Sequence, residues 1–186
     1  MKILKTLLAT LFLASSVQGA MFINVIESYT SVVFSYSGSL NTSGLVSTTD
    51  PSTAVGIRPS SGIFLNVPVT STAYNAFTTP VRFGDSTATV VPDLFTGDTF
   101  GLSGNTLRMP QGYVSGIWIT GSMTFNNADF ASLGLDPSGG PYVWTRIGFP
   151  EDTITMTFSP APEPSAYAAI LGLAGLATAS LRRRRR

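Results

Sequence analysis

The chain has 186 residues with no cysteine and no histidine, and its 11 Lys and Arg residues nearly balance its 10 Asp and Glu residues, for a net charge of +1. This composition excludes disulfides, thiolate or imidazole metal sites and a Ser-His-Asp triad. Most of the basic residues lie at the two ends, and residues 20–160 keep four arginines and nine acids, a net charge of −5. The central segment is therefore not expected to bind nucleic acid, because phosphate contacts need clustered basic side chains.

The first nineteen residues have the three-part pattern of a secretory signal peptide. Lys2 and Lys5 precede or interrupt the start of a short apolar core, which small and polar residues follow. Small residues are needed at the −3 and −1 positions of the cut, and Val17 and Gly19 provide them, so we expect cleavage after Gly19. Cleavage after Ala20 is less favourable, because it places a longer polar residue at −3. A permanent N-terminal anchor is the alternative, but the apolar core is short for a membrane span.

Residues 20–159 are expected to form an exported, mainly β domain. Apolar and polar residues alternate in 117–125 and in 153–158, which is typical of strands with one buried face. In the first segment Ile117, Ile119, Met123 and Phe125 share the apolar face, and Trp118 lies on the other. Weaker strand candidates are 22–27, 31–36, 63–67, 87–91, 99–102, 106–109 and 142–147.

These short segments, separated by Gly, Pro and Asn, predict a β-sandwich or a curled antiparallel sheet. The targeting segments would add an N-terminal signal helix and a short C-terminal transmembrane helix. Within the domain, residues 127–133 are expected to make one short helical turn. Residues 37–61 have few bulky apolar side chains and are expected to form long, mobile loops.

The acidic residues offer two weak alternatives to a non-catalytic domain. Paired carboxylates such as Asp93 with Asp98, or Glu151 with Asp152, could serve a glycosidase if they converged across a cleft. Asp93, Asp98 or Asp136 could also bind Ca²⁺, which takes oxygen ligands. However, these acids lie in turn-like contexts, where Asp usually accepts hydrogen bonds from its own backbone, and their spacing matches no EF-hand loop. The sequence therefore predicts no catalytic residue, no metal ligand and no cofactor.

Two tryptophans are the candidate glycan contacts. Trp118 and Trp144 could each stack on a sugar ring if exposed, and the position of Trp118 opposite an apolar face is suggestive. The interpretation that we favour is that these rings fill the core or its second face, as large aromatic side chains usually do.

The C-terminal segment, 160–186, combines a spacer, an apolar run and a charge cluster. Three prolines hold residues 160–165 extended, and the run 166–181 is almost entirely apolar. As a helix this run would measure roughly 24 Å, somewhat less than the hydrocarbon core of about 30 Å. It is followed by Arg182, Arg183, Arg184, Arg185 and Arg186, which should stay cytoplasmic.

Pro162, Glu163 and Pro164, followed by the short apolar helix and the arginine cluster, resemble the PEP-CTERM sorting signal of Gram-negative bacteria. The resemblance implies processing by exosortase, a membrane protease-transpeptidase. Residues 107–116, 130–135 and 142–145 also resemble one subgroup of this family, which implies a β-rich secreted domain without a catalytic motif. An ordinary single-pass tail anchor is the alternative reading of the same tail.

The sequence thus predicts an exported surface or matrix protein with no catalysis of its own. It would meet the secretory translocon and signal peptidase, be held transiently in the inner membrane, and reach the envelope or the medium after exosortase acts. The resemblance implies an association with extracellular polysaccharide or biofilm. The alternative functions are a carbohydrate-binding module or adhesin of that matrix and, third, a glycan-active enzyme.

Overall fold

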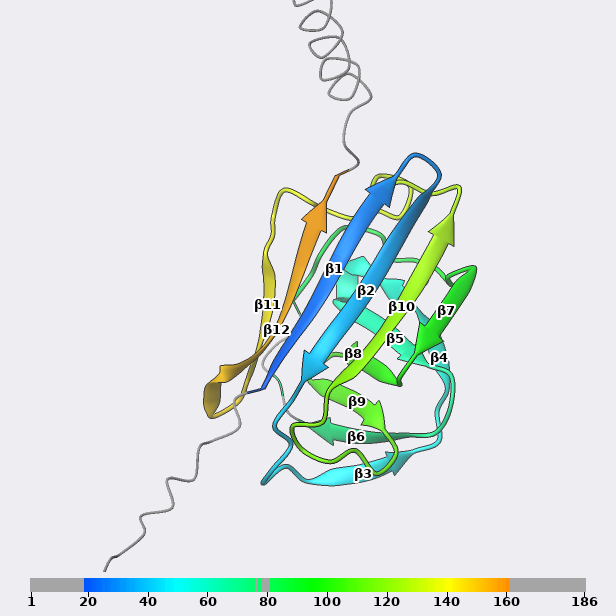
Figure 1. Cartoon of the computed structure of the whole chain (residues 1–186). Coiled ribbons are helices and arrows are strands. Elements are labelled where there is room, and N and C mark those ends of the chain that lie inside the picture. Colours follow the sequence, from blue (N-terminus) through cyan, green and yellow to red (C-terminus); the bar gives the residue numbers. More distant parts are fainter. Residues whose placement is uncertain (1–18, 76, 78–80, 161–186) are drawn as a thin grey trace, which may run out of the picture.

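The computed structural model describes residues 19–75, 77 and 81–160, which form two six-stranded sheets packed face to face (Figure 1). Aromatic side chains of the two sheets meet between them, and the expected mainly β, sandwich-like fold is confirmed. The signal segment 1–18, the Pro-Glu-Pro spacer from residue 161, the helix 166–181 and the arginine tail lie outside the described residues. Within the described part of the chain, no helix has the length and apolarity that crossing a membrane requires.

We call the sheet that faces the viewer in Figure 1 the front sheet. Its strand order is β11-β12-β1-β2-β10-β7, and only the β1–β12 pair is parallel. The bounds of its strands are β1 (Ala20–Ser28), β2 (Ser31–Ser39), β7 (Leu94–Gly97), β10 (Ile119–Asn126), β11 (Tyr142–Arg146) and β12 (Phe149–Ser159).

The back sheet is antiparallel throughout, and its strands cross behind the front sheet (Figure 1). Its order is β3-β6-β9-β8-β5-β4. The bounds are β3 (Ser47–Asp50), β4 (Ala54–Arg58), β5 (Ile63–Val67), β6 (Ser71–Asn75), β8 (Phe100–Ser103) and β9 (Thr106–Pro110), with a 3₁₀ turn, η1 (Pro59–Ser61), between β4 and β5.

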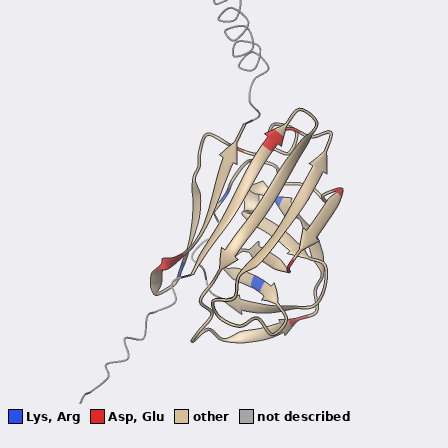
Figure 2. Cartoon of the chain, viewed as in Figure 1, with Lys and Arg blue, Asp and Glu red and all other residues tan. Residues whose placement is uncertain are grey.

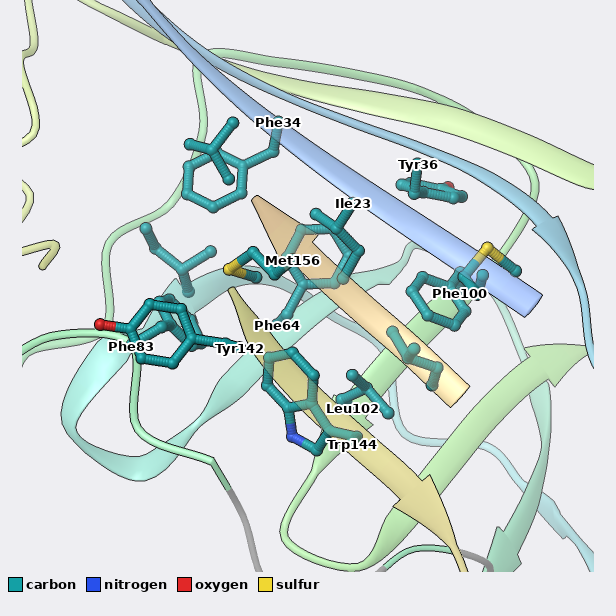
Figure 3. Close-up of a cluster of buried hydrophobic side chains, with 14 of the residues drawn as sticks. Ile23, Phe34, Tyr36, Phe64, Phe83, Phe100, Leu102, Tyr142, Trp144 and Met156 are labelled. Atoms are coloured by element: carbon teal, nitrogen blue, oxygen red, sulfur yellow. The ribbon is translucent and has the colours of Figure 1, made fainter. Parts of the chain in front are cut away.

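The core lies between the sheets and is rich in aromatic rings (Figure 3). Phe34 of the front sheet meets Phe64 of the back sheet at 5.9 Å between ring centroids, and Tyr36 meets Phe100 at 5.1 Å. Strands β1 and β2 contribute every second residue to this layer, because successive side chains of a strand point to opposite faces. This alternation leaves the other face of the front sheet toward solvent.

The first and last strands lie side by side in the front sheet. Ala20 is opposite Thr153, and Ile26 is opposite Ser159. Because the pair is parallel, the chain enters this sheet at one end, where β1 begins, and leaves it at the other, where β12 ends (Figure 1).

Most of the expected strands are present, and four expectations need correction. Residues 37–61 are not long loops, because they contain β3 and β4. Residues 87–91 form no strand and make one isolated bridge, from Val90 to Ile57. Ile117 precedes β10 and is 56% exposed, so it does not share the buried face with Ile119 and Met123. The strands β6 and β7 were not anticipated. Residues 127–133 do turn as expected, with the Leu133 N–H donating to the Asp129 oxygen at 3.2 Å.

Candidate functional site

The expected signal cleavage site lies at the first contact of the folded domain. Gly19 is buried, and its N–H donates to Asp152 Oδ1 at 2.7 Å. A Cβ at this position would lie 2.6 Å from the Asn41 nitrogen, so only glycine fits here. Ala20 begins β1. The bond after Gly19 is therefore accessible to a protease only while this end of the domain is unfolded. The sorting residues Pro162, Glu163 and Pro164, and Arg182 to Arg186, lie outside the described residues.

A buried ion pair holds this end of the domain together. Arg146 Nη1 lies 2.8 Å from Asp152 Oδ2, and both side chains are almost completely buried. The guanidinium also donates to the backbone oxygens of Asn41 and Ser43, each at 2.8 Å, and it stacks 3.9 Å over the ring of Phe149. Buried charges persist only when paired and hydrogen-bonded in this way. Sequence reasoning missed this pair, because the backbone oxygens of Asn41 and Ser43 that complete its surroundings lie about a hundred residues away along the chain.

The acids that could have formed a glycosidase pair do not converge. Asp152 faces the interior, whereas its neighbour Glu151 is exposed. Asp93 Oδ2 accepts the Asn126 N–H at 2.6 Å, and Asp98 Oδ2 accepts the Thr120 N–H at 2.9 Å. Because these two acids flank β7, their carboxylates fasten both ends of that strand to β10. Their occupied oxygens indicate a structural role.

Asp136, the third candidate Ca²⁺ ligand, organises its own turn. Its Oδ1 accepts the Ser138 hydroxyl at 2.6 Å and the Ser138 N–H at 2.9 Å. These hydrogen bonds, that from the Ser138 hydroxyl first, hold the pKa of Asp136 below its usual range. Across residues 19–75, 77 and 81–160 no group of three or more acids is placed to hold a metal ion.

A polar link that sequence reasoning missed crosses the core near β7. The Tyr36 hydroxyl donates to the Asp98 carbonyl oxygen, and Asn66 Nδ2 donates to Tyr36 Oη at 2.7 Å and to the Thr96 oxygen at 3.0 Å. Desolvation by burial raises the pKa of Tyr36 to about 12. Because Asn66 belongs to the back sheet and the other three belong to or flank strands of the front sheet, this link ties one sheet to the other.

The two tryptophans have opposite environments. Trp144 is fully buried and packs edge-on against Phe83, 6.3 Å between ring centroids, so it belongs to the core (Figure 3). It cannot contact a glycan, which corrects one of the two candidates. Trp118 is 62% exposed and ends the loop that leads into β10. The Gly116 N–H donates to the Leu40 oxygen at 3.0 Å, and this bond helps to hold the Trp118 loop in place.

One broad surface of the domain carries almost no charged side chains. In Figure 2 the front sheet is almost free of charge over β12, β1, β2 and β10, and the acids lie at strand ends and around β7. Glu27, near the end of β1, accepts the Phe130 N–H at 2.7 Å and so is used by the fold. The outward face of the front sheet is therefore an uncharged surface, and it also carries an exposed aromatic ring, Phe22.

Comparisons with protein-family models, with curated proteins and with solved structures found no match to this chain.

Proposed function

We propose that this chain is an exported surface or matrix protein, sorted by its C-terminal signal and without catalysis of its own. The observation that supports the proposal is the placement of the strands relative to the two targeting segments. β1 begins at Ala20, immediately after the expected signal cut, and β12 ends at Ser159, immediately before the proline spacer. Cuts at both sites would leave all the described strands in one piece.

The state of the acids supports a non-catalytic role. Asp93 and Asp98 accept backbone N–H groups, and Asp152 pairs with Arg146. A general acid or a nucleophile needs a carboxyl that faces substrate, with a partner across a cleft. These carboxyls instead hold strands and loops in place, so the domain works through its surface.

The parallel β1–β12 pair would orient the domain on the membrane. Ser159 lies opposite Ile26, whereas Trp118 precedes Ile119, which is opposite Gly38 at the Ala20 end of the front sheet. Six residue steps separate Ala20 from Ile26, which at roughly 3.3 Å per step is about 20 Å. A C-terminal anchor would therefore hold the Trp118 end away from the membrane.

The test is the intact mass of the protein recovered from the envelope and the medium of two Gram-negative hosts, one with an exosortase and one without. We expect loss of the residues beyond the Pro-Glu-Pro motif only in the host that has exosortase. Replacing Pro162, Glu163 and Pro164 by alanine should prevent that loss. Glu151→Ala is the matched control, because it removes an exposed acid outside the tail. A full-length tail in both hosts would mean that residues 166–181 are a lasting anchor, and the sorting proposal would be wrong.

A second function, that of an adhesin or carbohydrate-binding module, is favoured by one observation. Trp118 is a large aromatic side chain held in solvent by a hydrogen-bonded loop. Aromatic faces of this kind are common at binding sites, since they offer a large area at a small entropic cost. The two functions are compatible, because sorting depends on the tail and adhesion on the β domain.

A further inference from the structure

The outward face of the front sheet, which we call the hydroxyl face, is a lattice of uncharged side chains. Cross-strand pairing places these side chains in rows across the sheet. One row runs across five strands and consists of Val143, Thr155, Phe22, Ser37 and Thr120. The next row consists of Thr157, Asn24, Ser35, Ser122 and Thr96. Neighbouring strands lie about 4.8 Å apart, and successive rows about 6.7 Å apart.

The two rows on either side continue the pattern without a charge. Toward the end where β12 leaves the sheet, the row is Ser159, Ile26, Val33, Thr124 and Leu94. Toward the other end, it is Thr145, Thr153, Ala20 and Ser39. A domain whose net charge is −5 thus presents four adjacent rows that contain no acid and no base (Figure 2). A charge-free surface of this size selects against a highly charged partner, because nothing on it would pair with the partner's charges.

Aromatic rings stand within this lattice and at its border. Phe22 lies in the middle of its row and is 49% exposed. Trp118, 62% exposed, comes directly before β10, beside the row that ends at Ser39. Thr155 and Ser37 lie on either side of Phe22 in its row. In the next row some polar groups already bond to one another: the Thr157 hydroxyl lies 2.9 Å from Asn24 Oδ1, and the Thr96 and Ser122 hydroxyls lie 3.1 Å apart.

We propose that the hydroxyl face binds a neutral polysaccharide. Sugar rings would lie against Phe22 and Trp118, and sugar hydroxyls would exchange hydrogen bonds with the Ser, Thr and Asn rows. This inference rests on the adhesin function proposed above and assigns it a surface and a class of ligand. An acidic polysaccharide would meet no cation on this face and would be repelled by the net charge of the domain.

A second copy of the chain is the main competing occupant, and the composition of the face argues against it. The cores of protein interfaces are depleted in Ser and enriched in Tyr, Trp, Phe, Met and Arg. The hydroxyl face has the opposite balance, since most of its positions are Ser or Thr and it contains no Arg or Met. A neutral ligand rich in hydroxyl groups matches this surface better than a copy of the same surface does.

The test is co-sedimentation of the full chain, in mild detergent, with amorphous cellulose as a neutral glucan, and affinity electrophoresis in gels that contain alginate as an acidic polymer. We expect retention by cellulose and none by alginate. Phe22→Ala and Trp118→Ala should each weaken cellulose retention about tenfold, the usual scale for truncating an aromatic anchor. Thr155→Asp, which places a charge beside Phe22, should weaken it at least as much.

Phe95→Ala is the matched control. Phe95 is 44% exposed but is paired with the buried Met123, so it lies on the opposite side of the front sheet. Its loss should leave retention unchanged. Fluorescence of the buried Trp144 reports on the fold in every variant, and in Trp118→Ala it is the only tryptophan signal.

Each remaining outcome overturns the inference in a distinguishable way. Retention that survives both Phe22→Ala and Trp118→Ala leaves the adhesin function standing and removes the hydroxyl face as its site. No retention by cellulose overturns both the inference and the adhesin function. The sorting proposal is then unaffected, because the intact-mass experiment tests it separately. Equal retention by alginate overturns the selection for neutral ligands. A dimer in light scattering that Phe22→Ala abolishes would assign the face to a second copy.

Discussion

Asp152 joins the two ends of the β domain, and its removal should be among the most destabilising single changes in the chain. Asp152→Ala leaves the Arg146 guanidinium, 3% exposed, without its charge partner and, in the uncut chain, leaves the Gly19 N–H without an acceptor. Breaking a buried ion pair from one side typically costs about 3–5 kcal/mol. We expect a loss of that size in the free energy of unfolding.

The same geometry predicts that the two members of the pair are strongly coupled. Arg146→Met alone should cost about as much as Asp152→Ala, because it leaves a buried carboxylate unpaired. The double variant contains no unpaired charge, so its loss should be well below the sum of the two single losses. The less buried counterpart is the ion pair of Arg108 and Asp50, 2.9 Å apart with side chains 19% and 17% exposed, for which we expect about 1 kcal/mol or less.

The assay is urea unfolding of the full chain in mild detergent, followed by tryptophan fluorescence in a Trp118→Phe background. Trp144 is then the only tryptophan, and it lies two residues from Arg146 on β11. If the two single losses simply add in the double variant, within about 0.5 kcal/mol, then the pair is not coupled in solution. That result would refute the reasoning, whatever the size of the single effects.

Three further predictions concern the link across the core and the titrating groups. Gly121→Ala should destabilise by about 1–3 kcal/mol, measured by urea unfolding, because a Cβ there would overlap the buried Tyr36 ring and its hydroxyl. Hydrogen bonds from Ser52, Ser132 and Ser138 hold the pKa values of Asp50, Asp129 and Asp136 low in the folded state. The contribution of these three carboxylates to the free energy of unfolding should therefore be complete above about pH 4. It should be lost as the pH falls further, because the carboxyls of the unfolded chain take up protons first. When the free energy of unfolding is measured against falling pH, Asp136→Asn should show a shallower decrease than the unsubstituted chain. Burial raises the pKa of Tyr36 to about 12, so between about pH 10 and 12 this hydroxyl ionises only in the unfolded state, and the free energy of unfolding should fall. A Tyr36→Phe variant that shows the same alkaline loss of stability would contradict this.

The long front strands could be predicted because one of their faces is buried. In β10 and β12 the buried residues recur at every second position, so the alternation that the fold imposes is visible in the sequence. Strand β7, Leu94–Gly97, has four exposed residues and therefore no such pattern. Backbone pairing with β10 and the carboxylates of Asp93 and Asp98 hold it in place, and neither is visible in a local window.

The errors over 37–61 and 87–91 have the same physical origin. Strand β3, Ser47–Asp50, consists of polar, mostly exposed residues at the edge of the back sheet, and only its pairing with β6 makes it a strand. Residues 87–91 do alternate, but among them only Val90 makes a backbone bridge, to Ile57. Strand formation depends on a neighbour as much as on propensity, and the neighbours here lie far away along the chain.

The sequence pattern predicted the environments of the two tryptophans only in part. Alternation over Tyr142, Trp144 and Arg146 assigns all three to one face, and the structure buries all three. The arginine in that set can be buried because the carboxylate of Asp152, on the next strand, neutralises it, and a local sequence window does not show that pairing. Trp118 gave the reverse signal: its parity with Thr120 indicated the outward face, and it is exposed.

The parallel pairing of β1 with β12 connects folding with the proposed route of export. On the proposed route strand β1 leaves the translocon first, but its partner strand β12 lies more than a hundred residues later in the chain. Contacts this distant form late, because the loop between them must close first. A chain that ends before β12, for example at Gly148, should therefore remain protease-sensitive, with the β1 edge unpaired. On the proposed route the sandwich closes only when the last strand, and directly behind it the sorting tail, has reached the membrane. Folding of the β domain and arrest of the tail in the membrane would then occur together. A chain truncated before β12 that nevertheless becomes fully protease-resistant would show that the domain folds independently of the tail.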